Sequence, residues 1–415
     1  MIKYFLSAVV IVGSAWATNG YFTSSPSVIY KGLAGAGVAH PKGIMASGQN
    51  PAAAAFVDDG ISAGLSIFSP DRNITVLGKP SPGARLPLAP GKVVSSRSAF
   101  YVPAFAYNKA IDKSRAFSLM LQANGGMNTE YPASIFPGST APTGVDLSQL
   151  LVMPSYAHKV NEGQGAWGIS PVFALQRFEM LGLETFANGA FSSSPTDVTN
   201  QGHDYSLGLG IRFGYIKHLN KKWNFGLTWQ PKIRMSRFDS YKGLFAENGD
   251  FDIPENYNFG FTYRATQRLT WIFDIQSIKY SDVLAIGAPL SNLTVGGQLL
   301  GSSQGPGFGW QDMTAYKLGL EWQKNEKTTW RLGYSTGDQP IGPSEVLFNI
   351  LAPGVIEEHV SVGYSRAIDT ECDLDLAITH ALSSSVAGPH PMDPAQTIIL
   401  EMDQWEYSIA YSMKY

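Results

Sequence analysis

One short motif has the spacing of a catalytic nucleophile. Residues 60–64 read Gly-Ile-Ser-Ala-Gly, which matches the G-x-S-x-G pattern of hydrolases. That chemistry needs the serine on a sharp strand-to-helix turn, with a histidine and an acid behind it. Ser62 instead begins an alternating segment that no helical pattern follows. We therefore expect no enzyme. A lipase or esterase is the minor alternative, and it requires a hydrolytic activity that Ser62→Ala abolishes.

Metal and cofactor chemistry finds no support in the sequence either. None of the histidines shows the helical His-x-x-x-His spacing of a metal site, and they are His40, His158, His203, His218, His359, His380 and His390. The single cysteine, Cys372, excludes an intramolecular disulfide. A net charge of −3 over 415 residues provides neither a basic face for nucleic acid nor an acidic tail. We expect no metal, cofactor or nucleic-acid partner.

The chain from residue 60 onward is predicted to consist of strands. From residue 60 onward, apolar side chains alternate with polar or small ones, the period of a strand with two different faces. One such segment sets Leu207, Leu209, Ile211, Phe213 and Tyr215 against Ser206, Gly208, Gly210, Arg212 and Gly214. The charged fraction of 15% suits a surface that faces lipid. Alternation alone fits both a soluble sandwich and a membrane barrel.

The connections between the predicted strands favour the barrel. Short polar turns are expected at 108–115, 160–165, 218–222, 265–268, 324–327 and 367–371. Longer stretches rich in Gly, Pro and Ser are expected at 69–98, 128–148, 180–202, 238–255, 281–311, 336–356 and 383–396. A transmembrane meander sorts its connections in this way, whereas a sandwich has no reason to. We predict an all-β, antiparallel transmembrane barrel of about fourteen strands.

Both ends of the sequence are typical of an exported barrel. Lys3, the apolar run 4–12 and Ala15-Trp16-Ala17 predict a signal peptide over residues 1–17. The last predicted strand places large apolar side chains at alternate positions, namely Trp405, Tyr407, Ile409, Tyr411, Met413 and Tyr415. This pattern resembles the signal read by the machinery that inserts outer-membrane barrels, so we expect that machinery to be a partner.

Residues 18–59 lack the alternation and are rich in glycine and alanine. Such a compact segment is a poor wall strand. We expect it to lie in the lumen as a hatch, and residues 60–415 to form the barrel. A loose tail outside the barrel is the alternative.

Six short motifs, in this order, resemble those of the long-chain fatty acid transporter (FadL) family, which also includes aromatic-hydrocarbon uptake (TodX-type) members. They are Asn19-Gly20-Tyr21-Phe22, residues 31–37, Asn50-Pro51-Ala52 with Phe56, residues 128–132, residues 309–313 leading into Lys317-Leu318-Gly319, and residues 349–353. The resemblance covers nearly the whole mature chain. It implies fourteen strands and a hatch that moves at Asn50, Pro51, Ala52 and Phe56. It also implies capture of ligand from outside, a hydrophobic pocket, and a sideways exit at a kinked third strand.

The third predicted strand supports that exit physically. Its outward residues run to Ala123 and are followed by Asn124, Gly125 and Gly126. Two glycines weaken strand pairing and permit a bulge or an inward bend. We expect a lateral opening at these three residues. The alternative is that the glycines only relieve crowding against the hatch.

A pocket for an amphiphile with a carboxylate needs apolar walls and one or two fixed donors. Lys317 on the lumen face is the strongest donor candidate, followed by Arg212 and by Arg177, which simple alternation places outside. These cations could equally pair with the lumen carboxylates Glu321, Asp274 and Asp375. Apolar residues in loops 180–202 and 238–255, including Leu181 and Phe186, suggest a capture surface.

The expected function is passive uptake of hydrophobic molecules, foremost long-chain fatty acids, across the outer membrane of a Gram-negative bacterium. The alternatives are a channel for aromatic hydrocarbons or alkanes, and a general porin or structural barrel. Membrane lipid, lipopolysaccharide and the hydrophobic ligand are the expected partners, and the expected state is a monomer.

Overall fold

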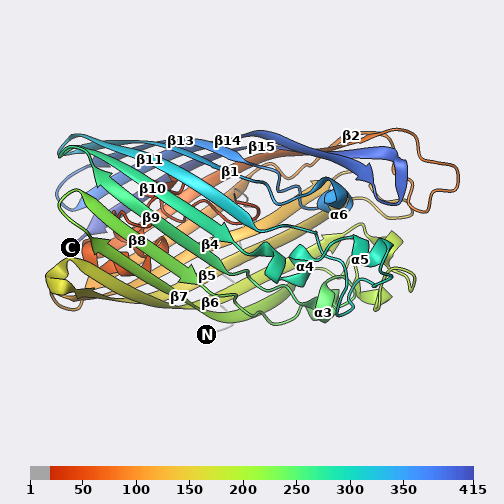
Figure 1. Ribbon diagram of the computed structural model, residues 1–415, viewed down its shortest axis with the longest axis horizontal. Helices are drawn as coiled ribbons and strands as arrows, with labels where there is room; N and C mark the ends of the chain where they lie inside the picture. The colour runs from red at the N-terminus through yellow and green to blue at the C-terminus, as the bar shows by residue number, and fades with distance from the viewer. Residues whose placement is uncertain (1–18) are drawn as a thin grey trace.

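The computed structural model describes residues 19–415, and the predicted signal peptide lies outside that range. An antiparallel sheet forms a long tube (Figure 1). Its strands are β1 (Gly60–Leu77), β2 (Gly91–Val94), β3 (Phe100–Ala110), β4 (Arg115–Tyr131), β5 (Thr143–Val160), β6 (Gly165–Leu181), β7 (Asp204–His218), β8 (Trp223–Gln230), β9 (Asn256–Arg264), β10 (Leu269–Ile278), β11 (Met313–Asn325), β12 (Thr328–Gly337), β13 (Glu358–Ala367), β14 (Cys372–His390) and β15 (Asp393–Lys414).

The sheet closes on itself because its last strand pairs with its first. β15 runs antiparallel to β1 over the whole of β1, from Gly60↔Lys414 to Leu77↔Thr397. The short β2 pairs only with the far end of β1. Within residues 19–415 the closed wall therefore has fourteen strands, β1 and β3 to β15, and the predicted fold is confirmed. No helix in this range is long and apolar enough to cross a membrane.

The two faces of each strand have the chemistry that a lipid-embedded wall requires. In β7, Leu207 and Leu209 are each 66% exposed on the outer face. Ser206, whose side chain faces the lumen, is fully buried. A closed ladder satisfies the backbone hydrogen bonds internally, so only side chains meet the hydrocarbon. The greasy side of the alternation is therefore the outer surface and not a core.

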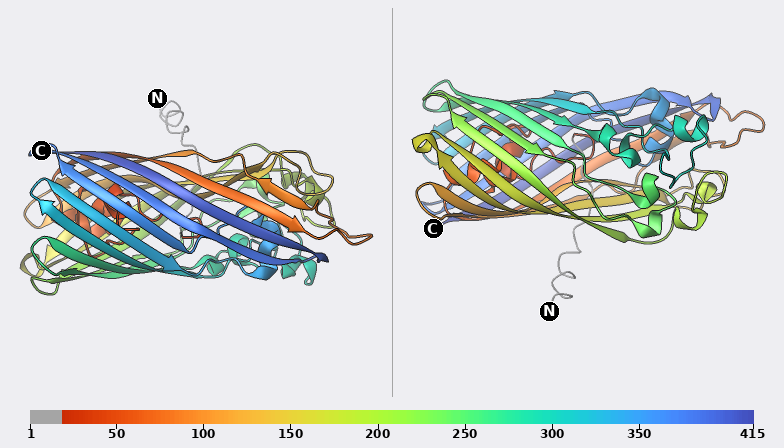
Figure 2. Two further views of the ribbon diagram at one scale, coloured as in Figure 1. Left: turned by 90° about the horizontal axis from the view of Figure 1, so that it is seen from above. Right: turned by 60° about the horizontal axis from the view of Figure 1, so that its bottom comes forward.

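The six short turns lie at one end of the tube, and most of the long connections lie at the other. Residues 383–396 are an exception, since a long loop was predicted there. β14 and β15 instead continue to His390 and from Asp393 as a hairpin that projects beyond the rim (Figure 2). The prediction was wrong because Gly388 and Pro389, which are typical of loops, lie here within strand β14. Gln396 holds the hairpin to residues 78–90 by hydrogen bonds with the backbone of Leu88, at 3.1 and 2.8 Å.

Within residues 19–415 all helices are short, and they lie in the long connections or in the N-terminal segment, except for one 3-10 helix in the short turn between β5 and β6. The α-helices are α2 (Val28–Lys31), α3 (Ala246–Gly249), α4 (Leu284–Gly287), α5 (Ser291–Thr294) and α6 (Val346–Asn349). The 3-10 helices are η1 (Ile44–Gly48), η2 (Pro51–Phe56), η3 (Asn161–Gly163), η4 (Glu184–Phe186), η5 (Pro195–Asp197), η6 (Asp239–Tyr241), η7 (Tyr280–Asp282) and η8 (Pro343–Glu345).

Residues 19–59, called the hatch below, lie inside the tube, where Figure 2 shows them in red toward the short-turn end. Most of their side chains are buried, and α2, η1 and η2 contact strands on several sides of the wall. This segment has no strand ladder of its own. Its backbone groups pair within short helices and turns, for example Lys31 with Ser27 at 2.9 Å, and with side chains of the hatch and wall.

Candidate functional site

The hatch approaches the wall closely because glycines line the wall beneath it. A Cβ atom at Gly214 would overlap Asn50, and one at Gly168 would overlap the Pro51–Ala52 peptide. The same holds for lumen-facing glycines of four more strands, Gly226, Gly260, Gly333 and Gly363, which face the hatch or the residues that bind it. We call these six residues the glycine track. Because these residues have no side chain, the backbone of the hatch can pack directly on the backbone of the wall.

Asn50 joins the hatch to the wall through its side chain. Nδ2 donates to the carbonyl of Val38 at 2.8 Å and to the wall carbonyls of Tyr215 and Leu227 at 3.2 and 3.4 Å. Oδ1 accepts from the amide of Ala52 at 3.0 Å and caps η2, in which Pro51 occupies the first turn. The Phe56 ring at the end of η2 packs edge-on against His218.

Buried charges fix the hatch at further points. Lys31 forms an ion pair with Glu406 and donates to Ser66 at 2.7 Å. Asp274 accepts from the amides of residues 37 and 38 at 2.7 and 2.9 Å. Its neighbour in the ladder is Lys317, whose Nζ donates to Gln276 at 2.8 Å and to the carbonyl of residue 35 at 3.5 Å. The ammonium of Lys317 is therefore engaged by the wall and the hatch.

Glu321, another predicted lumen carboxylate, joins the hatch to a charged chain along the wall. It contacts His40 Nε2 at 3.2 Å and Arg331 Nε at 2.8 Å. Arg331 then donates to Ser365 at 2.5 Å, and Ser365 donates to Asp375. His40 therefore joins the hatch to β11, several strands away from the contacts that Asn50 makes with β7 and β8.

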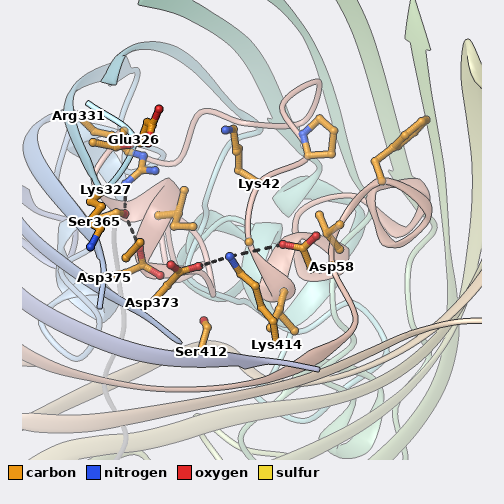
Figure 3. A pocket seen from close by; sticks show the side chains of 18 residues that line it. Lys42, Asp58, Glu326, Lys327, Arg331, Ser365, Asp373, Asp375, Ser412 and Lys414 are labelled. Atoms are coloured by element: carbon orange, nitrogen blue, oxygen red, sulfur yellow. Dashed lines mark hydrogen bonds and ion pairs between the residues drawn. The ribbon is translucent and has the colours of Figure 1, made fainter. Parts of the chain in front are cut away.

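A polar cavity of about 350 Å³ lies between the hatch and the wall at the short-turn end (Figure 3). Charges of both signs line it. Lys414 reaches toward Asp58 at 3.5 Å and Asp373 at 2.7 Å, as the dashed lines show. Lys42 and Arg331 line the same space. An apolar solute leaving the lumen in this direction would have to displace water from charged groups.

The wall is incomplete between β3 and β4. Their pairing runs from Ala110↔Ala116 to Ala104↔Gln122 and goes no further, although β4 continues to Tyr131. Beyond this point residues 122–129 of β4 are all buried, so the strand has left the lipid-facing surface. A register shift against β5 between Ala123 and Gly125 marks the bend. The hydrogen-bonded wall thus has a break beside the first residues of β3, on the long-loop side of Ala104.

Residues of the hatch cover this break from within. The amide of Thr23 donates to the Asn124 carbonyl at 2.9 Å, and the amide of Gly126 donates to the Tyr21 carbonyl at 3.0 Å. A Cβ atom at Gly125 would overlap that same Tyr21 carbonyl. The three residues predicted to form an opening are therefore the part of β4 that binds the N-terminal segment. Pairing with the segment replaces pairing with β3.

An apolar pocket lies among the long loops, above the hatch. Four loops contribute to it, and its lining is Met180, Leu183, Phe186, Leu244, Phe245, Ala285, Leu300, Pro306, Gly307, Phe308, Phe348 and Leu351. No charged residue is among them. The loops are closed over about 30 Å³ of free space, so a long ligand could enter only if they part.

One of these loops, 231–255, carries an acidic pair that should make it sensitive to pH. Burial, Asp252 and Glu247 together raise the pKa of Asp250 to about 6. A raised carboxyl pKa stabilises the folded loop at low pH, and that contribution is lost as the pH rises through 6. We expect cleavage of the loop by a protease to be several-fold slower at pH 5 than at pH 7.5. Burial also raises the pKa of Asp252, so Asp250→Asn should reduce the difference without removing it, and an unchanged pH dependence in that variant would contradict the assignment.

The remaining predicted residues occupy separate places. Arg212 faces the lumen, where it donates to Gln230 and to the carbonyl of residue 48. Arg177 is not brought into the lumen, because β6 pairs with β7 without a bulge, and on the outer face it forms an ion pair with Asp146 at 2.8 Å. Leu181 lies on that outer side as well. Ser62 is buried in β1 against Ser412, with no strand-to-helix turn.

Three features of the site were missed. The glycine track was visible only as small residues on the polar side of strands. Tyr21 was quoted as part of a motif, but its position over the break gave no local signal. Arg72 lies on the lumen side of β1, next to Asn73. Its position could be predicted only if β1 were extended beyond Ser69, where the strand was predicted to end. Extending the alternation past Pro70 could have found it.

Comparisons with known proteins agree with this architecture. The model of the family described as outer membrane protein transport protein (OMPP1/FadL/TodX) matches residues 8–398. No curated protein matches the sequence significantly. In fold, the chain is similar to the crystal structure of a Pseudomonas aeruginosa FadL homologue, with a TM-score of 0.68, 14% identity and coverage of 95% of this chain and 99% of that one.

Two toluene transporters have the same fold. For TodX of Pseudomonas putida the TM-score is 0.66 and the identity 16%, over 96% of this chain and 100% of that one. For TbuX of Ralstonia pickettii the values are 0.61 and 19%, over 96% and 99%. Because the family model covers most of the sequence, the chain belongs to the OMPP1/FadL/TodX family and is an outer-membrane channel for hydrophobic substrates, not an enzyme.

Proposed function

We propose that this channel takes up long-chain fatty acids and releases them sideways into the membrane through the break between β3 and β4. The short-turn end faces the periplasm and the long loops face outward, as in other barrels of this kind. Ligand is captured by the apolar pocket among the loops, passes the N-terminal segment at Tyr21, and leaves beside Gly125. Movement of the hatch around Asn50, Pro51, Ala52 and Phe56 accompanies this passage.

The observation that carries the proposal is the replacement of β3 by the hatch as the partner of β4. Two backbone hydrogen bonds, from Thr23 to Asn124 and from Gly126 to Tyr21, hold the segment over the break. Each contributes about 1 kcal/mol, so the cover is far easier to displace than a strand of the wall. An apolar solute that displaces it reaches hydrocarbon directly.

The polar cavity below the hatch favours the same route. It is lined by ion pairs such as Lys414 with Asp373. Passage of a fatty chain through it gains no apolar contact and disturbs charged groups. The sideways route avoids that cost, because both the loop pocket and the membrane are apolar.

Uptake of aromatic hydrocarbons is the second candidate. It is favoured by the phenylalanines of the loop pocket, Phe186, Phe245, Phe308 and Phe348, which offer ring faces to a flat ligand. Two of the similar structures are toluene transporters. Measuring uptake of radiolabelled oleate and toluene in parallel separates the two candidates.

The test is to replace Gly125 by valine. The added side chain overlaps the Tyr21 carbonyl, and its β-branched shape favours a regular strand at the bend. We expect oleate uptake by cells that depend on this channel to fall at least fivefold. Gly189→Val is the matched control, because a Cβ atom there meets nothing within 4 Å.

Both variants must be inserted at wild-type levels, as judged by surface proteolysis and by the shift in gel mobility on heating. Wild-type uptake in the correctly inserted Gly125→Val channel would overturn the lateral route. Failure of the unmodified channel to carry either oleate or toluene would overturn the proposed function as a whole.

A further inference from the structure

Arg72 is a buried cation next to the break in the wall. Its side chain is directed into the lumen from β1, and the residue is only 5% exposed. Nη2 donates to the carbonyl of Arg97 at 3.0 Å, and the guanidinium lies 5.6 Å from the centre of the Phe100 ring. Nε has no hydrogen-bond partner. Within residues 19–415, none of the ion pairs includes Arg72.

Burying a guanidinium without a counter-ion destabilises the folded protein. Two other buried cations of the lumen have ion-pair partners, Lys31 with Glu406 and Arg331 with Glu321. Lys317 and Arg212 have none within the described residues, but each donates to a hatch carbonyl, at residues 35 and 48, which Arg72 does not. Arg72 therefore does not serve to hold the hatch, and its charge is free to meet an anion that comes from outside the chain.

The cavity beside Arg72 has the composition of a site for an amphiphile. Its apolar lining includes Tyr21, Met127, Trp310 and Met402, and it extends to Gly126 at the break. The carboxamide of Asn128 also lines it, and Oδ1 of that group has no partner. Turned by 180°, the same group presents an N–H donor. One cation and one amide against apolar walls suit a carboxylate with an alkyl chain.

We propose that Arg72, with Asn128, binds the carboxylate of a fatty acid at the inner side of the lateral break and thereby selects acids over neutral molecules of the same length. The proposal rests on the proposed function. The free space is about 20 Å³, enough for about one water molecule. The head group therefore fits only when Tyr21 and its neighbours move, and these are the residues that cover the break. Binding of the carboxylate and uncovering of the break become one event.

The test compares two ligands with the same tail. Binding of radiolabelled oleate and of oleyl alcohol is measured by equilibrium dialysis with the purified full-length protein in one non-ionic detergent, so that partition into micelles is matched. For Arg72→Met, which keeps the length of the side chain, we expect oleate affinity to fall tenfold to a hundredfold. Oleyl alcohol affinity should change less than twofold, and Arg72→Lys should retain most of the preference for oleate.

Arg97→Met is the matched control. It removes a positive charge close by, but its side chain is exposed and paired with Glu130, and its backbone carbonyl still accepts from Arg72. We expect wild-type binding. Arg72→Met should also unfold at the wild-type temperature or above, since it removes a buried unpaired charge.

Unchanged oleate affinity in Arg72→Met would overturn the proposal. An equal loss of affinity for oleate and oleyl alcohol, or a clear loss of thermal stability, would also overturn it, since either result indicates a structural role. If the unmodified protein binds the alcohol as tightly as the acid, the head-group site is overturned while uptake of hydrophobic molecules stands. If it binds neither, the proposed function fails first.

Discussion

Replacing Gly214 by valine should open the barrel to sugars. The new side chain overlaps Asn50 and crowds Pro51, so the hatch cannot keep its contact with β7 and β8. The hydrogen bonds of Asn50 to Val38, Tyr215 and Leu227 would be lost together. Liposomes that contain the unmodified protein should not swell measurably in arabinose. Those with Gly214→Val should swell at least ten times faster than protein-free liposomes.

Gly189→Val, which meets no atom, should leave the liposomes sealed. The variants are compared only where heating shifts their gel mobility as it does for the unmodified barrel. A correctly folded Gly214→Val barrel that excludes arabinose would show that the hatch does not need this contact. Swelling with the unmodified protein would instead favour a general porin.

Replacing Lys31 by methionine should give the largest loss of stability. Lys31 and Glu406 are 2% and 6% exposed, so the substitution leaves a carboxylate buried without its cation. Breaking such a pair costs about 3–5 kcal/mol. The free energy of unfolding can be measured by guanidinium titration of the protein in lipid vesicles.

The double variant Lys31→Met, Glu406→Gln should regain most of that loss, since it leaves no buried charge. Lys92→Met is the control, because its pair with Glu401, which lies on β15 as Glu406 does, is about half exposed, and such pairs contribute about 1 kcal/mol or less. If Lys31→Met costs no more than Lys92→Met, the hatch is not held by this pair.

Strand alternation determined most of what could be predicted. It placed Leu207 on the outside and Lys317 in the lumen, because a strand has only two faces and a closed wall gives each face one environment. The same rule placed Arg177 outside the lumen. The sorting of short and long connections then separated the barrel from a sandwich. These features are local, so neighbouring residues in the sequence are enough to find them.

The break in the wall could not be found in this way. Gly125 indicated a weak point in β4, but the partner that replaces β3 is Tyr21, about one hundred residues earlier in the chain. The counter-ion of Lys31 is likewise far away, at Glu406. Contacts between distant segments depend on how the hatch packs inside the folded barrel. The alternation within a single strand does not predict that packing.

The glycine track has an evolutionary consequence. Gly226 and Gly333 of the wall are required only where the hatch backbone packs directly against them. Conversely, a hatch that packs in this way can bind only to a wall that has glycine at those positions. Hatch and barrel are therefore not interchangeable modules, and changes in one constrain changes in the other. A chimera that pairs this hatch with the barrel of a distant relative should assemble only if the six glycine positions are transplanted with it.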